Sequence, residues 1–151
     1  MGSVVPYEES HRAVILGNLR EVDERELYML TRLSPPSAFD MTASGAVRMW
    51  SGFEGGELIC VFGINRRTPL STVGVPWLIG TNAIERHYRT FGKHSIKYAR
   101  LFEQAFPQME NFVLAENHIT ARWLKWLGFD MGEPTPMGFS NAPFIRFTKG
   151  F

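Results

Sequence analysis

The sequence has few cysteines, little net charge and no long apolar run. It holds one cysteine, Cys60, so neither an internal disulfide framework nor a cysteine zinc site can form within one chain. A formal net charge of +1 gives no field that would favour nucleic acid or an anionic membrane. No apolar run approaches the length of a bilayer span, and the N-terminus lacks the pattern of a signal peptide. We therefore expect no membrane span, no nucleic-acid partner, no metal and no secretion.

Aromatic residues, in contrast, are plentiful. Twelve Phe and four Trp in 151 residues are enough for a substantial core. No internal repeat or interdomain linker is visible, so the chain is expected to form a single domain over residues 1–151. Helical and strand patterns both occur, which favours the α+β class.

The first third of the chain is mainly helical in pattern. Val4 and Val5 suit an edge strand that Pro6 ends, and residues 8–19 have apolar residues at helical spacing. Asp23 is predicted to cap a second helix, with Glu26 completing a capping box. The Ser-Pro-Pro-Ser run at 34–37 should stop that helix, and its last serine should cap a short turn.

The middle of the chain reads as a meander of three antiparallel strands. Residues 46–50 alternate between apolar and polar, residues 57–64 are apolar almost throughout, and residues 75–81 form a third run. Residues 82–91 are expected to form a short helix that Gly92 breaks. A long amphipathic helix then covers residues 95–106, and residues 143–148 form a final strand.

The most informative stretch is residues 112–129. It reads as a short buried strand, an Asn117 cap, a helix of about three turns and a Gly128 stop followed by Phe129. An asparagine, ten residues and Gly-Phe resemble the last block of the GNAT superfamily of acyl-CoA-dependent N-acyltransferases.

That resemblance implies a fold and a cosubstrate. The fold has a central, mostly antiparallel sheet with helices on both faces and one splayed parallel pair, here residues 77–81 and 112–116. The gap would hold the pantetheine arm of acetyl-CoA or another acyl-CoA. Arg89 and Gly92 match the family's pyrophosphate loop, which presents amides at a helix start; the alternative is a helix break with a solvated cap. The residues expected to bind the cosubstrate are Leu78, Ile79, Arg89, Phe91, Gly92, Lys93, His94, Ser95 and Asn117.

No general base stands out. The candidates are Glu116, Glu85 and His87, although the sequence favours a solvated charge over a catalytic role for each of them. Leu124 stands where many family members have a tyrosine that protonates the leaving thiolate. His94 also stands where the family usually has Gly or Ala.

Three features recur together from Trp77 onward: Arg89-x-x-Gly-Lys before the long helix, a strand that leads into Asn117 and a Trp-Leu-Lys-x-x-Gly helix, and a tail with Phe-Thr-Lys-Gly at 147–150. This combination resembles a narrower group, the GNAT-like internal virion proteins of short-tailed phages. Two functions therefore remain open. One is transfer of an acyl group to an amine on a small molecule or protein. The other is a catalytically degenerate virion or assembly protein whose partners are other virion proteins. The expected location is the host cytoplasm or the virion.

Overall fold

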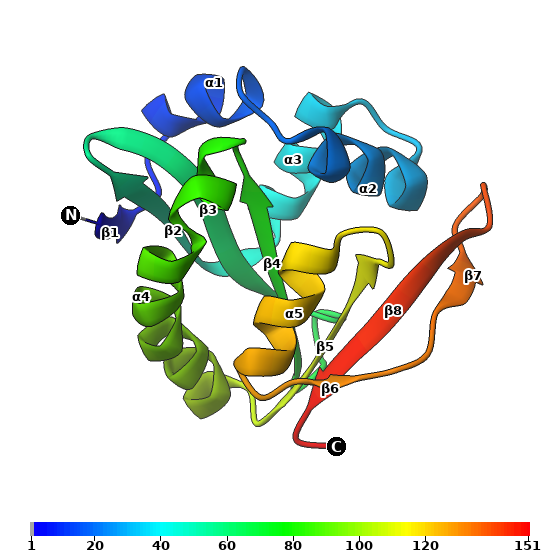
Figure 1. Cartoon of the computed structure of the whole chain (residues 1–151). Helices are drawn as coiled ribbons and strands as arrows, with labels where there is room; N and C mark the ends of the chain where they lie inside the picture. Colours follow the sequence, from blue (N-terminus) through cyan, green and yellow to red (C-terminus); the bar gives the residue numbers. More distant parts are fainter. Residues whose placement is uncertain (1) are drawn as a thin grey trace.

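The computed structural model describes residues 2–151, which form one mixed sheet with helices on both faces (Figure 1). The elements in chain order are β1 (Gly2–Pro6), α1 (Ser10–Leu16), α2 (Glu21–Thr31), α3 (Pro35–Ser44), β2 (Ala46–Glu54), β3 (Glu57–Arg66), β4 (Val73–Gly80), α4 (Ala83–Ala105), β5 (Gln108–Leu114), α5 (His118–Trp126), β6 (Asp130–Met131), β7 (Thr135–Met137) and β8 (Ala142–Lys149).

The sheet has the order β1-β2-β3-β4-β5-β8-β6, and β7 pairs with β8. Every pairing is antiparallel except β4 with β5, which is parallel. The predicted α+β class, the three-strand meander and the neighbouring parallel strands are thus confirmed. The short strands β6 and β7 were not predicted, because the turn-rich segment after Phe129 carries no strand periodicity.

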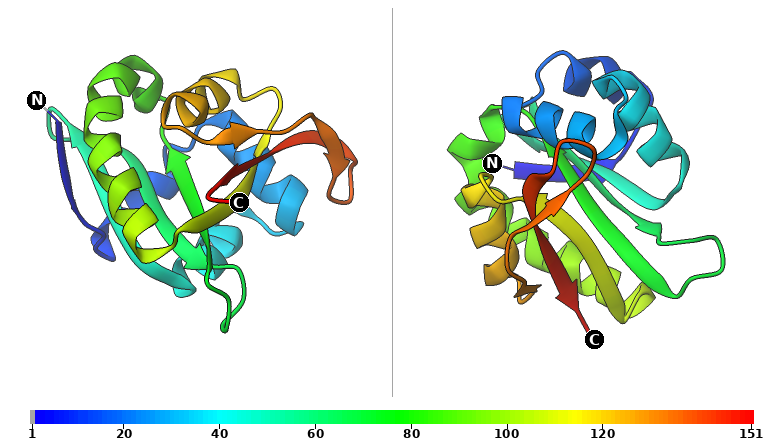
Figure 2. Two further views of the ribbon diagram at one scale, coloured as in Figure 1. Left: turned by 90° about the horizontal axis from the view of Figure 1, so that it is seen from below. Right: turned by 90° about the vertical axis from the view of Figure 1, so that its right-hand side faces the viewer.

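Helices cover both faces of the sheet (Figure 2), and an apolar cluster lies beneath the helices of each face. Helices α4 and α5 cover one face, where Phe62, Phe102 and Leu124 belong to the same cluster. Helices α1 and α3 pack on the other face through Ile15 and Phe39. Helix α2 lies on this second face and contacts β5, so it reaches the middle of the sheet.

Helix α4 corrects one prediction. It runs without a break through Gly92, where the sequence suggested a stop between two helices. The buried side chains Ile84, Phe91 and Phe102 recur at helical spacing across the glycine, so one apolar face continues along the whole helix. Burial of that face outweighs the cost of a mid-helix glycine, which is about 0.5–1 kcal/mol.

The starts of α2 and α3 correct two further predictions. Helix α2 begins at Glu21 after Arg20, and Asp23 and Glu26 do not form the predicted capping box. Their carboxylates bind backbone amides of the sheet instead. Helix α3 begins at Pro35 rather than after Ser37, because proline is well suited to a first helical turn.

Candidate functional site

The site lies where the two parallel strands separate. Strands β4 and β5 are paired only at Val73 with Gln108 and at Gly74 with Met109. Farther along, Pro76 has no N–H to offer to a neighbour. From that point the strands diverge towards their C-terminal ends, as the sequence predicted (Figure 1).

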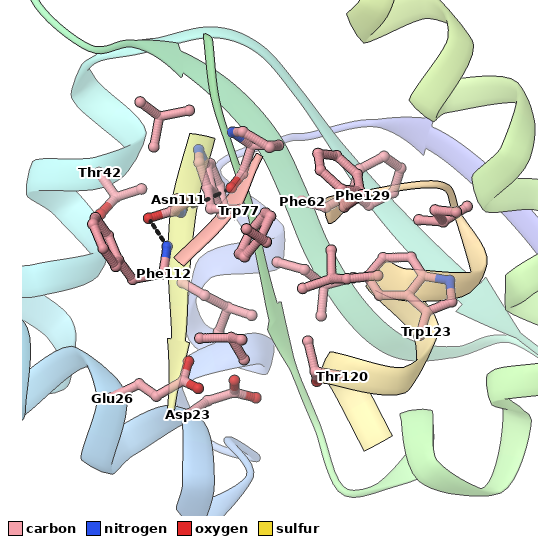
Figure 3. A pocket seen from close by; sticks show the side chains of 18 of the residues that line it. Asp23, Glu26, Thr42, Phe62, Trp77, Asn111, Phe112, Thr120, Trp123 and Phe129 are labelled. Carbon is pink, nitrogen blue, oxygen red and sulfur yellow. Dashed lines mark hydrogen bonds between the residues drawn. The ribbon is translucent and has the colours of Figure 1, made fainter. Parts of the chain in front are cut away.

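Asn111 bridges the strands just after they separate. Its Nδ2 donates to the carbonyl of Pro76 on β4 at 2.8 Å, and its Oδ1 accepts from the N–H of Phe112 on β5 at 2.8 Å. Figure 3 shows this side chain between the two strands. One carboxamide therefore satisfies a carbonyl and an amide that a regular ladder would have paired.

Two carboxylates of α2 close the wider end of the gap. Asp23 and Glu26 are three residues apart, so they lie on the same face of the helix. Asp23 Oδ2 accepts from the N–H of Gly80 at 3.0 Å, and Glu26 Oε1 accepts from the N–H of Leu114 at 2.9 Å. Each carboxylate thus caps one of the separated strands.

Asp23 has a structural role. Both Asp23 and Arg20 are 3% exposed, and Arg20 Nε donates to Asp23 Oδ2 at 2.7 Å. Burial raises the pKa of Asp23, while the Arg20 guanidinium acts in the opposite direction. With Arg20 and the Gly80 amide bound, this side chain serves the ends of α2 and β4 rather than a ligand.

Glu26 has the properties of a base that works near neutral pH. Burial raises its pKa to about 7, and the charge of Asp23 adds to that effect. Its two hydrogen bonds, from Leu114 N and from Asn117 Nδ2 at 3.2 Å, both use Oε1. Glu26 lines the cavity described below, so Oε2 is placed to meet a ligand there.

Leu78 turns a backbone N–H towards the gap. The N–H of Thr81 bonds to Ile59 O on β3 at 2.9 Å, and Leu78 lies opposite Phe62. Because bonded and non-bonded pairs alternate along an antiparallel ladder, Leu78 belongs to a non-bonded pair. Its N–H and C=O therefore point away from β3 and towards β5. An N–H in this position can stabilise a developing oxyanion.

A cavity of about 300 Å³ passes through the gap. Leu27, Thr31 and Thr42 line it on the face of α2 and α3, and Phe91, Tyr98 and Trp123 line it on the face of α4 and α5. Figure 3 shows Glu26 and Trp123 on opposite sides of this space. One cavity thus gives two molecules access to the gap from opposite faces of the sheet.

A second, smaller depression of about 20 Å³ lies between the first turns of α4 and α5. It is lined by Ile84 and Tyr88 of α4, Ile119 of α5, and Leu78 at the gap. Leu78, Phe91, Thr120 and Trp123 line both spaces. Leu78, with its gap-facing N–H, thus lies where this depression meets the cavity, at the point that the reactive arm of an acyl-CoA would have to reach.

None of the three predicted bases lines the cavity. Glu116 is about half exposed and pairs with Arg25 at 2.9 Å. Glu85 lies in the first turn of α4, 3.8 Å from Arg20, and His87 is half-buried elsewhere on that helix. Sequence reasoning missed Glu26 because its spacing from Asp23 also suits a capping box. The signal that could have found it is the same spacing, since residues three apart on a helix share a face.

The predicted pyrophosphate loop does not have the expected local structure. Residues 89–95 lie inside α4, so their amides belong to a helix interior rather than to a helix start. Phe91 and Ser95 point to the cavity, and Gly92 is buried against Trp126. Arg89 and Lys93 are exposed, and His94 lies beside Gly2 of β1. Contact of these residues with a cosubstrate stays a prediction.

The actual start of α4 has its amides already bound. Ala83 N donates to Thr81 Oγ1 at 3.2 Å, Ile84 N to Thr81 O at 3.1 Å and Glu85 N to Asn82 O at 3.3 Å. The carboxylate of Glu85 also lies in this first turn. A pyrophosphate at this end would have to displace these bonds.

Two more predicted residues lie near the gap. Asn117 caps α5 as predicted, accepting from Thr120 N at 3.4 Å, and it also donates to Glu26. Ile79 is buried in the cluster under α1 and α3, although it lines the cavity as well.

Among residues 2–151, no group of three or more His, Cys, Asp or Glu could hold a metal. None of the helices in this range is long and apolar enough to span a membrane.

Comparison with known proteins gives a likeness in structure alone. No protein-family model matches the sequence, and no curated protein matches it. An N-acetyltransferase from Staphylococcus aureus Mu50 is similar with a TM-score of 0.68 and 12% identity, covering 98% of this chain and 97% of that one.

Two further solved structures agree. The GNAT-family acetyltransferase from Streptococcus pneumoniae has a TM-score of 0.63 and 13% identity, with 99% of each chain covered. Spermidine N-acetyltransferase from Vibrio cholerae, in complex with CoA and spermine, has a TM-score of 0.65 and 14% identity, covering 97% of this chain and 94% of that one. With the splayed β4–β5 pair, these likenesses establish that the chain has the GNAT acetyltransferase fold.

Proposed function

We propose that the protein transfers an acyl group from acyl-CoA to a primary amine. The observation that carries this proposal is that one cavity joins the gap-facing N–H of Leu78 to the carboxylate of Glu26. These are the two groups that aminolysis of a thioester needs, namely an oxyanion donor and a base. The GNAT fold of the chain supports the same reading.

The bond changes and proton transfers of the reaction can be assigned to these two groups. The amine nitrogen bonds to the thioester carbonyl carbon, and the carbonyl oxygen takes the negative charge next to Leu78 N–H. Glu26 accepts a proton from the attacking nitrogen. The carbon–sulfur bond then breaks as the carbonyl re-forms, and the thiolate takes up a proton. Glu26, with a pKa of about 7, can return its proton, because an ordinary thiol has a pKa of about 8.5.

The chain's residues divide the work between the two faces. Acyl-CoA supplies the activated thioester, and Tyr88, Ile119 and Leu78 surround the path by which its arm would reach the gap. The amine would enter from the face of α2 and α3, past Leu27 and Thr31, to reach Glu26. The acceptor amine belongs to a small molecule or to a protein, and it must reach this carboxylate.

The test is transfer from acetyl-CoA to a panel of alkyl and arylalkyl primary amines, read as release of free thiol and as amide by mass spectrometry. Glu26→Gln should lower the rate about 10²- to 10⁴-fold, and Glu116→Gln should leave it unchanged. The wild-type rate at saturating amine should rise as pH passes through about 7 and Glu26→Gln should lose that rise, because only ionised Glu26 accepts a proton. An unchanged rate in Glu26→Gln would remove Glu26 from the mechanism.

A second candidate is a GNAT-fold virion or assembly protein of a phage that has lost the chemistry. The observations that favour it are the bonded amides at the start of α4 and Leu124 in place of the thiol-protonating tyrosine. Its partners would be other virion proteins, and it would be found in the virion, whereas the enzyme would work in the host cytoplasm. Calorimetric titration with acetyl-CoA separates the two, since the second candidate predicts no binding.

A further inference from the structure

We propose that the acyl group is a medium-length chain rather than acetyl, and that it lies in an apolar arm of the cavity beneath α4 and α5. This inference rests on the proposed function, because it specifies the donor of the same reaction. We call this space the inner arm. It is the part of the cavity on that face, lined on α4 by residues from Phe91 to Phe102, on α5 by Thr120, Trp123 and Leu124, and beyond α5 by Leu127 and Phe129.

The inner arm is long. Its lining residues on α4 run from Phe91 to Phe102, which is about 16 Å at the rise of an α-helix. Along α5 and the residue that follows it, they run from Thr120 to Leu127. An acetyl group at the gap would leave most of this length without a partner.

The inner arm is also suited to hydrocarbon. The polar groups of Ser95 and Trp123 already have hydrogen-bond partners. Trp123 Nε1 donates to Ser95 Oγ at 3.0 Å, and Ser95 Oγ donates to Gly92 O at 2.6 Å. The remaining walls are largely aromatic and aliphatic. An apolar ligand therefore gains contact area there without breaking the hydrogen bonds that join Trp123, Ser95 and Gly92.

Leu78 fixes which end of the donor enters the inner arm. It lines both the cavity and the smaller depression between α4 and α5. Phe91 and Trp123, whose ring centroids lie 6.0 Å apart, also line both spaces and form the wall between them. A thioester carbonyl held at Leu78 N–H would have its sulfur side in the depression. Its acyl side would then point past the wall into the inner arm, leaving the face of α2 and α3 for the amine.

This arrangement predicts a chain-length preference. Burial of each methylene is worth about 0.8 kcal/mol, so affinity should rise up to about four-fold for each methylene that the inner arm accepts. The experiment is calorimetric titration of the full chain with acetyl-, butanoyl-, hexanoyl- and octanoyl-CoA in the absence of amine. Ala99→Leu narrows the inner arm, and Ala105→Leu, on an exposed site of the same helix, is the matched control.

We expect wild type and Ala105→Leu to bind hexanoyl-CoA at least ten-fold more tightly than acetyl-CoA. Ala99→Leu should lose that advantage while keeping its affinity for acetyl-CoA. Equal affinity for all lengths, or a preference untouched by Ala99→Leu in a variant with normal melting behaviour, overturns the inference.

The two proposals can fail separately. Transfer of acetyl but not hexanoyl groups would leave the acyltransferase proposal standing and reject the long donor. To cover the reverse case, hexanoate alone is titrated while the methyl NMR signals of Ala99 and Leu127 are followed. Shifts there without binding of any acyl-CoA would support the inner arm and reject the acyltransferase. Absence of both would reject both.

Discussion

At the residue scale, two carboxylates on one face of α2 have different roles. Asp23 is neutralised by Arg20 and holds the end of β4, while Glu26 holds the end of β5 without a cationic partner in its hydrogen bonds. The same helix face therefore carries one structural carboxylate and one whose pKa is raised to about 7. Such a difference in environment is how proteins assign different roles to identical groups.

Glu26→Gln should stabilise the protein at alkaline pH. The pKa of Glu26 rises from 4.5 to about 7 on folding, so its contribution to stability is full below about pH 4.5 and is lost as pH rises through 7. Glutamine stays neutral and keeps an oxygen for Leu114 N. Urea unfolding at pH 8 should show a gain of about 1–3 kcal/mol, which disappears near pH 4.5. An equal change at both pH values would contradict a titration origin.

Arg20→Met should destabilise the protein strongly. It leaves Asp23, 3% exposed, without its cation in the interior. Removal of one partner of a buried ion pair costs about 3–5 kcal/mol, which urea unfolding measures. The double variant Arg20→Met with Asp23→Asn should recover part of that loss, since asparagine can still accept from Gly80 N. If the two single losses simply add, the ion pair is not the cause.

At the element scale, α4 is the part that differs most from the sequence-based expectation. A glycine in an amphipathic pattern suggested two helices and an anion-binding turn, but the buried stripe through Phe91 and Ser95 continues across it. Gly92 has ordinary space around it: a Cβ there would meet Trp126 Cζ3 at 3.8 Å.

Gly92→Ala should therefore stabilise the protein by about 0.5–1 kcal/mol, because alanine has the higher helix propensity and fits the space. Thermal unfolding checks this. The matched control is Gly63→Ala on β3, whose Cβ would lie 2.5 Å from the backbone oxygen of Arg48 and should destabilise. Loss of stability in Gly92→Ala would indicate that the glycine is needed for its backbone conformation.

Elements with one clear periodicity could be predicted from the sequence, and those governed by distant contacts could not. The alternation in β2, the apolar run of β3 and the Asn117–Gly128 frame of α5 each depend on neighbours in the chain. The hydrogen bond from Leu114 N to Glu26 Oε1 joins residues 88 positions apart, so it forms only after α2 packs on the sheet. The parallel pair was expected from the resemblance to the GNAT superfamily, whereas the Glu26 carboxylate that reaches it from α2 is marked by no local pattern.

At the scale of the whole molecule, the sheet separates two approaches to one cavity. Helices α4 and α5 border one approach, and α2 and α3 border the other (Figures 1 and 2). Two substrates can therefore be present together, and a direct transfer needs no covalent acyl-protein intermediate. Cys60, the chain's one thiol, is 0% exposed and does not line the cavity, and burial raises the pKa of that thiol.

The kinetics should consequently be sequential. Initial rates measured against amine concentration at several fixed acyl-CoA concentrations should give intersecting double-reciprocal lines, because transfer requires both substrates at the gap. Cys60→Ala should keep full activity per folded molecule, since a buried thiol with a raised pKa supplies almost no thiolate at neutral pH. Parallel lines, the pattern of a ping-pong mechanism, would require a nucleophile in the cavity. Loss of activity in a well-folded Cys60→Ala variant would identify that nucleophile and refute direct transfer.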